Sequence, residues 1–407
     1  MEAKPAMHWG ATAFALLLLG CCVIPSAWAQ YEVEEQSSVW MRALLDVRLV
    51  RGGPELSWTD RGRGKLRYGG EIDGVSSTDR TQVALSELAI EMGAALPWNI
   101  RAQGQINIEP DVAGNYEPWL IEATLRKEWE TPATGWGLQA GLSNVPFSLE
   151  HTGPAWTPQY ALSASVLNSW LWEEISLAGV EAEWWHQSKT GPRLGVTLGL
   201  GYGLDQMGKL LALRGWAMGG APSGLNADLP LPDGSRITVF HERDHRPAAY
   251  TWITLNDPEE RGALKLGYMD NMGDQATPGV WRTRFGTVGS VLHPLPSVDL
   301  VVQYLRGKAL VGNSSNDSSL RAFYALLSKR YRSHRLTVRY DEFRVADLDG
   351  GNSTSESGDA ITVAYAFELG LRQRIGIEYT SLSSDRPGSA LAHLSQDGWQ
   401  ISYRFRY

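Results

Sequence analysis

The stretch DGWQISYRFRY, residues 397–407, alternates between apolar and polar side chains, and this alternation limits the folds open to the chain more than any other feature. Trp399, Ile401, Tyr403, Phe405 and Tyr407 are apolar or aromatic, and the residues between them are polar or charged. Successive side chains of a β-strand point to opposite faces, so the stretch predicts a strand with one dry face and one wet face. Chain ends usually fray, so this strand needs a partner that holds it.

The same period of two recurs along most of the chain. It is clear in IRAQGQINIEP, residues 100–110, where the apolar or small residues occupy one face. Comparable stretches are VWMRALLDVRLV, WLIEATLRKEWE, RLGVTLGLGYGL, GALKLGYMD, VDLVVQYLRGK, RLTVRYDEF, DAITVAYAFEL and QRIGIEYTSL. With less regular stretches added, the pattern predicts roughly 16 to 18 strands, each as long as a tilted membrane-spanning β-segment.

The connections between these strands alternate in length. Short turns such as Arg332–His334 alternate with long polar segments such as Gly312–Ser319 and Leu348–Gly358. Many Trp and Tyr residues stand near strand ends, for example Trp119 and Trp129. Short turns at one end, long loops at the other and aromatic girdles at both interfaces are typical of outer-membrane barrels.

A sheet with so little helical patterning has nothing else in the chain to cover its apolar face. Closing the sheet pairs every backbone group, which is the condition for a β-structure to cross hydrocarbon. We therefore predict an all-β fold, a transmembrane antiparallel β-barrel of about 16 strands of the outer-membrane porin type, formed by residues 30–407 as one domain. The final strand then pairs with the first, Val39–Val50. The irregular residues 215–247 are expected to form a long loop that folds into the pore.

The N-terminal residues have the pattern of an export signal. Lys4 precedes the apolar run ATAFALLLLGCCVIP, and Ala27-Trp28-Ala29 offers a small-x-small cleavage site, which predicts a signal peptide over residues 1–29. The alternative is that Leu18-Leu19-Gly20-Cys21 is a lipobox, which would leave Cys21 lipidated. Both cysteines of the chain, Cys21 and Cys22, lie in this segment, so the predicted mature chain has no thiol for catalysis, metal binding or a disulfide.

Strand parity identifies the side chains that would face the lumen. In the predicted barrel the apolar set contacts lipid and the polar set lines a water-filled channel. The pore-lining candidates are Arg42, Arg48, Arg101, Glu109, Glu122, Arg126, Lys265, Arg282, Arg284, Arg335, Arg339, Arg404 and Arg406. Arginine leads this set, which is the basis for a hypothesis that the channel prefers anions. An equally open alternative is that mixed charge only keeps the lumen wet.

Three features argue against other functions. The net charge of −8 is unlike the basic surface that nucleic-acid binding needs. His241-Glu242-x-x-His245 matches a zinc-protease signature, but that motif requires a helix, and Pro247 follows within two residues. Gly199-x-Gly201-x-Gly203 lacks the βαβ unit of a nucleotide site, and we expect these glycines on the lumen face. We predict no enzyme activity, no cofactor and no metal.

The segment Ala140–Glu150, AGLSNVPFSLE, resembles a Gly-x-x-x-x-Pro-Phe-Ser/Gly-x-Glu segment of the phosphate-selective porin O and P family. The aromatic last residue, Tyr407, is similar to the assembly signal of outer-membrane barrels. The resemblance implies a homotrimeric channel in the bacterial outer membrane that contacts lipid. It also implies that the channel passes small solutes or inorganic anions, with phosphate-like anions among them. The alternatives from other classes are an outer-membrane barrel enzyme and a secreted, Trp-rich β-sandwich that binds a ligand.

Overall fold

The computed structural model describes residues 38–73, 76–110, 116–188, 191–220, 222–259, 261–312, 316–350, 355–387 and 392–407. Val39–Tyr407 form one folded unit. The predicted signal peptide over residues 1–29, including Cys21, lies outside the described residues. Within the described ranges, no helix has both the length and the apolar character needed to cross a bilayer.

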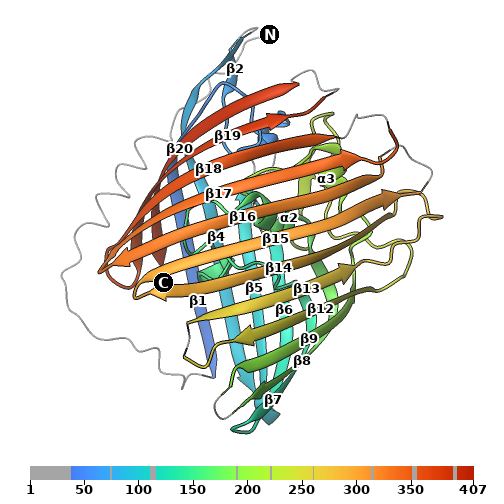
Figure 1. The fold of residues 1–407 in the computed structure, drawn as a ribbon, viewed down its shortest axis with the longest axis vertical. Coiled ribbons are helices and arrows are strands. Elements are labelled where there is room, and N and C mark those ends of the chain that lie inside the picture. Colours follow the sequence, from blue (N-terminus) through green and yellow to red (C-terminus); the bar gives the residue numbers. More distant parts are fainter. Residues whose placement is uncertain are drawn as a thin grey trace, which may run out of the picture. The chain divides into compact units, whose positions relative to one another are not determined.

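Sixteen strands form a closed antiparallel barrel (Figure 1), which confirms the predicted fold class. In chain order the barrel strands are β1 (Val39–Gly52), β4 (Arg80–Leu96), β5 (Ile100–Pro110), β6 (Tyr116–Glu130), β7 (Thr134–Asn144), β8 (Ser176–Gln187), β9 (Arg193–Tyr202), β12 (Ala248–Asn256), β13 (Gly262–Asp270), β14 (Trp281–Leu295), β15 (Val298–Val311), β16 (Ser318–Tyr331), β17 (His334–Asp347), β18 (Glu356–Glu368), β19 (Gln373–Asp385) and β20 (His393–Arg406). Consecutive barrel strands are neighbours throughout. Each barrel strand therefore finds backbone partners on both sides, as a membrane-spanning sheet requires.

The barrel closes between its first and last strands. β20 pairs with β1 in antiparallel register, with Phe405 opposite Leu45 and Tyr403 opposite Val47. Beyond the ladder, the Tyr407 N–H donates to the Ala43 carbonyl oxygen at 2.9 Å, and the Ala43 N–H donates to the Tyr407 carbonyl oxygen at 3.2 Å. The predicted pairing of the final strand with Val39–Val50 is confirmed, and the seam removes the unpaired edge that an open sheet would leave.

The two faces of β20 differ sharply in exposure. Trp399 and Ile401 of β20 are 50% and 46% exposed, whereas Ser402 and Arg404, which alternate with them, are buried. Many strands present large apolar side chains outward in the same way. A soluble protein rarely exposes a continuous apolar surface of this extent, so the outer face is the surface that a bilayer covers.

The two ends of the barrel carry different connections. One end has short turns, among them residues 97–99 as the 3-10 helix η2 (Pro97–Asn99), 296–297 and 332–333. The other end carries long segments with further elements, namely η1 (Trp58–Asp60), β2 (Glu71–Asp73), β3 (Ser76–Thr78), η3 (Pro154–Trp156), α2 (Val166–Glu174), α3 (Lys209–Leu213), β10 (Asp228–Pro230) and β11 (Arg236–Thr238). We call these the short-turn end and the long-loop end.

Two long connections fold into the barrel interior. We call residues 145–175, between β7 and β8, the inner segment, and residues 203–247, between β9 and β12, the second segment. Ser165 caps α2 of the inner segment by accepting a hydrogen bond from the Asn168 N–H at 3.2 Å. All nine residues of α2 are buried. Trp170 of α2 packs edge-on against Trp216 of the second segment and Phe285 of β14, so part of the barrel interior is an apolar core.

Candidate functional site: the barrel interior

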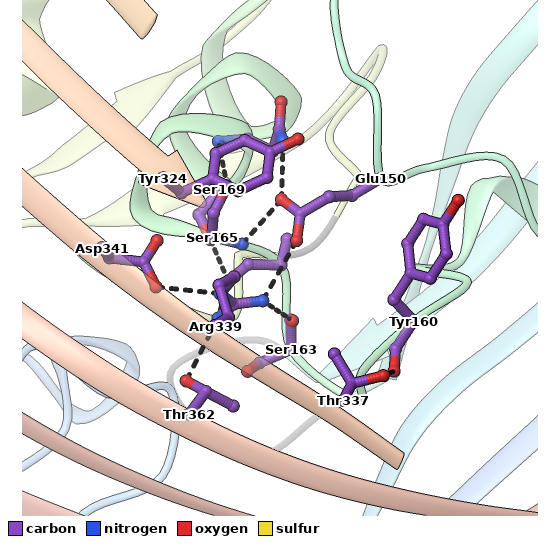
Figure 2. A network of polar contacts seen from close by, with 12 residues as sticks. Glu150, Tyr160, Ser163, Ser165, Ser169, Tyr324, Thr337, Arg339, Asp341 and Thr362 are labelled. Carbon is purple, nitrogen blue, oxygen red and sulfur yellow. Dashed lines mark hydrogen bonds and ion pairs between the residues drawn. The ribbon is translucent and has the colours of Figure 1, made fainter. Parts of the chain in front are cut away.

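Arg339 of β17 joins the barrel wall to the inner segment (Figure 2). Its guanidinium donates to the Ser163 and Ala164 carbonyl oxygens at 2.7 and 3.1 Å and to Glu150 Oε1 at 3.1 Å. Asp341, two residues along the same strand face, accepts from Arg339 Nε at 2.8 Å and from the Val166 N–H at 3.1 Å. All of these side chains are fully buried. Buried charges of this kind must be paired, so the network fixes the inner segment against the wall.

Other wall side chains hold the same segment. Glu378 of β19 accepts hydrogen bonds from the Leu162 and Ser163 N–H groups at 2.6 and 3.1 Å. Thr337 Oγ1 donates to the Tyr160 carbonyl oxygen at 2.8 Å, and Gln303 Nε2 donates to the Phe147 carbonyl oxygen at 2.9 Å. The inward polar side chains of β15 to β19 thus bind the backbone of a folded segment, and only part of this wall is left to contact water.

A second charge network lies at the seam. Asp46 of β1 is buried between Arg48 of the same strand and Arg404 of β20, each with a guanidinium nitrogen 2.8 Å from Asp46 Oδ2. Ser402 Oγ donates to Asp46 Oδ1 at 2.7 Å. Two arginines share one carboxylate, so the group carries a net positive charge at the middle of the wall.

Two cavities open at the short-turn end of the barrel. One has a volume of about 670 Å3 and the other about 460 Å3, and both are lined by Thr152, Gln159, Arg330 and Arg335. A third cavity of about 30 Å3 lies further along the wall, where Arg48 and Gln400 face His151 and Trp156 of the inner segment. The space open to water is far smaller here than in the other two cavities, so the interior narrows at this point.

The charges around the interior are unevenly distributed. The two larger cavities are lined by eight basic side chains and three acidic ones. The basic residues are Arg261, Lys265, Arg330, Arg332, Arg335, Arg374, Arg404 and Arg406, and the acidic residues are Glu259, Asp299 and Glu368. On the opposite wall, β6 and β8 present Glu128, Glu181 and Glu183 around Arg126. The inner surface therefore has a basic side and an acidic side.

Burial changes the ionisation of two groups in the inner segment. Burial lowers the pKa of His151 well below its usual value, and the nearby Arg339 guanidinium adds to this effect. Burial also raises the pKa of Glu174 to about 7, even though the Leu210 and Gly208 N–H groups donate to its carboxylate at 2.9 and 2.8 Å. Glu174 thereby links the end of α2 to the start of α3.

The structure distributes the predicted pore-lining residues over several environments. On the inner face, four are buried, namely Arg48, Glu122, Arg339 and Arg404. On the same face, Arg42, Arg101, Arg126, Lys265, Arg335 and Arg406 are exposed or partly exposed. Arg101 forms an ion pair with Glu128, and Arg126 pairs with Glu128 and Glu183. Glu109 lies in β5, but its side chain is outside the described part of the chain.

The prediction that Arg282 and Arg284 line the lumen is wrong for this register. Their neighbours Trp281, Thr283 and Phe285 are buried and face inward, where Thr283 Oγ1 donates to the Met207 carbonyl oxygen. Arg284 is exposed on the outer face, and Arg282 forms an outer-face ion pair with Asp270 at 3.0 Å. The assumption that polar means inward fails in β14 because apolar loop residues cover its inner face.

Sequence reasoning placed Arg339 on the inner face but missed that it anchors the inner segment. Glu150 lies in the segment that carried the family resemblance, but nothing in the sequence indicates that its partner is Arg339, 189 positions away. Arg374 was also missed, although it has the parity of Glu378 in the QRIGIEYTSL strand and could have been found from that pattern. The inner segment itself gave no signal beyond its place between two predicted strands.

The two other motifs do not form the helix or the βαβ unit that their catalytic or nucleotide-binding interpretation requires. Residues 241–245 form a bridge and bends without a helix, with the His241 N–H bonded to the Gly203 carbonyl oxygen at 2.9 Å. Carboxylate oxygens of Asp205, Glu242 and Asp244 lie within 4.8 Å of one another. They accept the N–H groups of Arg243, Gly203 and Arg246, respectively. On β9, Leu198 and Leu200 are exposed on the outer face, and Gly199 and Gly201 lie against the inward-facing Tyr250 and Leu177.

Comparison with known proteins supports the fold. The sequence matches no protein-family model and no curated protein. Solved structures match closely in architecture, among them the anion-selective porin from Comamonas acidovorans, with a TM-score of 0.57, 12% identity, and 91% of this chain and 99% of that chain covered. The outer membrane channel DcaP of Acinetobacter baumannii gives a TM-score of 0.53 at 10% identity, covering 91% and 98% of the two chains.

A third similar structure is OmpF of Salmonella typhi in complex with daunomycin, with a TM-score of 0.51, 10% identity, and 91% and 97% of the two chains covered. At identities this low, the structural matches establish a shared fold and nothing finer. The resemblance to the phosphate-selective porin O and P family is thus supported to the level of the outer-membrane porin barrel, and no family model carries it further.

Proposed function

We propose that this chain is an outer-membrane porin, a passive diffusion channel for small hydrophilic solutes or ions. The observation that carries the proposal is the combination, in one closed barrel of sixteen strands, of an apolar outer belt with an interior that holds buried and solvent-accessible charged side chains. A barrel of this size is wide enough for an aqueous path, with its width set by what folds inside. Two of the comparable structures are titled as a porin and as an outer membrane channel, those from Comamonas acidovorans and Acinetobacter baumannii.

The proposed route runs from the long-loop end, past the inner segment, into the basic cavities at the short-turn end. The narrow cavity between Arg48 and Trp156 is the constriction on this route. Residues 215–247, predicted to fold into the pore, contribute through Trp216 and Met218, which pack in the same apolar core as α2. In this proposal both interior segments set the pore width.

We further propose that the channel prefers anions. The excess of eight basic over three acidic side chains around the cavities raises the local concentration of anions and lowers that of cations. The Comamonas acidovorans structure is titled an anion-selective porin, which agrees with this preference. Phosphate-like solutes fit the same chemistry, because arginine binds such groups with two parallel hydrogen bonds.

The assembly that we propose is a homotrimer in the lipid of the bacterial outer membrane. The family resemblance of residues 140–150 implies three copies, and the exposed apolar outer face offers the surface on which copies and lipid pack. Chemical cross-linking in detergent, followed by electrophoresis without heating, tests this number of copies.

The alternative of a barrel enzyme finds little support in the described residues. A zinc-protease site would need His241 and His245 on one helix face, and His245 has a positive φ of 58° in a bent loop. The alternative of a secreted sandwich conflicts with the closed barrel, because a sandwich is built from two open sheets packed face to face.

The deciding experiment is conductance in a planar bilayer. Insertion of the purified protein should raise the conductance in discrete steps. Under a salt gradient, the reversal potential should have the sign of an anion-selective channel. If heat-modifiable migration shows that the protein is folded but no conductance steps occur at high protein concentration, the channel proposal is contradicted. A reversal potential that indicates cation selectivity would contradict the anion preference alone.

A further inference from the structure

Basic side chains form a continuous row on the outside of the barrel. The register places Arg306 of β15 directly opposite Arg321 of β16, and Arg321 directly opposite Arg344 of β17. Beside them, Arg284 of β14 is opposite Lys308 of β15. All five side chains are exposed. We call these five residues the cationic row.

The row faces outward and not into the interior. Its residues alternate along their strands with Phe285, Leu305, Ala322 and Phe343, which are at most 1% exposed and belong, with Trp170 of α2, to the interior core. Since neighbouring side chains of a strand point to opposite faces, the cationic row lies on the surface that meets the membrane.

Most charges of the row have no ion-pair partner in the protein. Like charges directly opposite each other on neighbouring strands are destabilising. Among the described residues, Arg321 has an ion pair, with Glu342 at 3.3 Å, and the side chains of Arg284, Arg306, Lys308 and Arg344 have none within 4.0 Å. Acidic residues end the row on both sides: Asp359 of β18 stands opposite Glu342, and Asp270 of β13, which pairs with Arg282, stands opposite Arg284. Anions from outside the chain would relieve the repulsion within the row.

The depth of the row indicates where those anions come from. Tyr304 lies two residues before Arg306 on the same outer face, and Phe323 lies two residues after Arg321, so an aromatic band borders the row. Aromatic side chains of this kind sit at the boundary between hydrocarbon and headgroups. On the other side, β15, β16 and β17 end within three to five residues, at the long-loop end. The row is therefore at headgroup level.

We propose that the cationic row is a binding site for the phosphate groups of a phosphorylated membrane lipid in the leaflet at the long-loop end. Guanidinium groups bind phosphate oxygens through two parallel hydrogen bonds, and five cations along one line suit a headgroup that carries more than one phosphate. A lipid is favoured over free phosphate because the row is an exposed line at headgroup depth and not an enclosed pocket. The proposal rests on the barrel lying in a membrane and does not depend on conduction.

The test compares a charge-removing variant with a charge-keeping one. The first is the triple variant Arg306→Gln, Arg321→Gln, Arg344→Gln, and the second replaces the same three residues by Lys. A matched control is Lys127→Gln with Lys329→Gln, which removes outward cations near the short-turn end. Each protein is titrated with bisphosphorylated lipid A in mixed detergent micelles, and bound lipid is counted by native mass spectrometry.

We expect the Gln variant to bind bisphosphorylated lipid A at least tenfold more weakly, and the Lys variant and the control to stay within threefold of the unchanged protein. Equal binding by the Gln variant would overturn the proposal. Inorganic phosphate should not displace the lipid at millimolar concentration, and displacement there would assign the row to free anions instead.

Thermal unfolding, measured by heat-modifiable migration in electrophoresis, gives an independent test. The difference in unfolding temperature between the Gln variant and the unchanged protein should change sign when lipid is added. Without lipid, the Gln variant should unfold at a higher temperature than the unchanged protein, because like-charge repulsion is removed. With bisphosphorylated lipid A the order should reverse. A Gln variant that loses oligomers but retains lipid would show that the row binds a second copy of this chain and would overturn the lipid site.

Discussion

Arg339 of β17 and Glu150 of the inner segment form a fully buried ion pair, with Arg339 Nη1 3.1 Å from Glu150 Oε1. The pair links the barrel wall to the segment that narrows the interior. Glu150 also accepts from the Ser165 N–H at 3.0 Å, so the same carboxylate holds the start of α2. This pair therefore connects the wall both to the inner segment and to the start of its helix.

Replacing Arg339 by Met should release the inner segment. The change leaves Glu150 and Asp341 buried without their partner, which costs about 3 to 5 kcal/mol for a buried pair. We expect a larger and noisier single-channel conductance and a lower unfolding temperature. Lys329→Met, an outward change on the neighbouring strand, is the control and should leave both unchanged. An Arg339→Met channel with normal conductance would show that the segment does not need this anchor.

The proposed anion preference should depend on basic side chains that line the cavities. Changing Arg330, Arg374 and Arg406 to Gln removes three of the eight positive charges there, and the reversal potential should move toward cations. Changing Arg284 and Lys308 to Gln removes positive charge from the outer face and should leave the potential where it was. Equal shifts in both variants would mean that overall charge, and not the cavity, sets selectivity.

Arg101 and Arg126 should also affect selectivity, for a reason that the structure adds. Both pair with Glu128, and Arg126 also pairs with Glu183, so replacing the two arginines by Gln leaves these inward carboxylates uncompensated. We expect a shift of the reversal potential toward cations. An unchanged potential would place these residues away from the conducting path.

Cysteine labelling can test the corrected orientation of β14. The two cysteines of the chain are Cys21 and Cys22, both in the predicted signal peptide, so a new cysteine would be the sole thiol of the mature protein. A charged thiol reagent should reduce conductance of Lys265→Cys, which faces a cavity, and not of Arg284→Cys, which faces outward. Block of Arg284→Cys would restore the original lumen assignment.

Glu174 should make the stability of the interior depend on pH. Its pKa rises from 4.5 to about 7 on folding, so between these values the folded protein holds a proton that the unfolded chain has lost. The contribution of this group is thus fully present below about pH 4.5 and is lost as the pH rises to about 7, a change of about 3 kcal/mol. Urea unfolding of Glu174→Gln should show less loss of stability between pH 5 and 8 than the unchanged protein. An identical pH dependence would contradict the assignment.

The alternation of side chains was enough to determine the barrel. A period of two over most of the chain, without helical patterns to cover a sheet, leaves closure as the way to pair every backbone group, and DGWQISYRFRY indicates a terminal strand that needs the first strand. For most strands the parity also gave the correct face, as in Arg404 against Tyr403. The conducting role of the individual side chains stays a prediction.

Only the tertiary structure decided what contacts the inner face. Alternation shows that two faces differ but does not show whether the inner one meets water or another part of the chain. In β14 the inner face packs on apolar loop residues, so Trp281 and Phe285 point inward and Arg284 outward. Arg339 is likewise bonded to a segment nearly two hundred positions away in the sequence. Such contacts depend on how distant segments pack, and a local pattern carries no information about them.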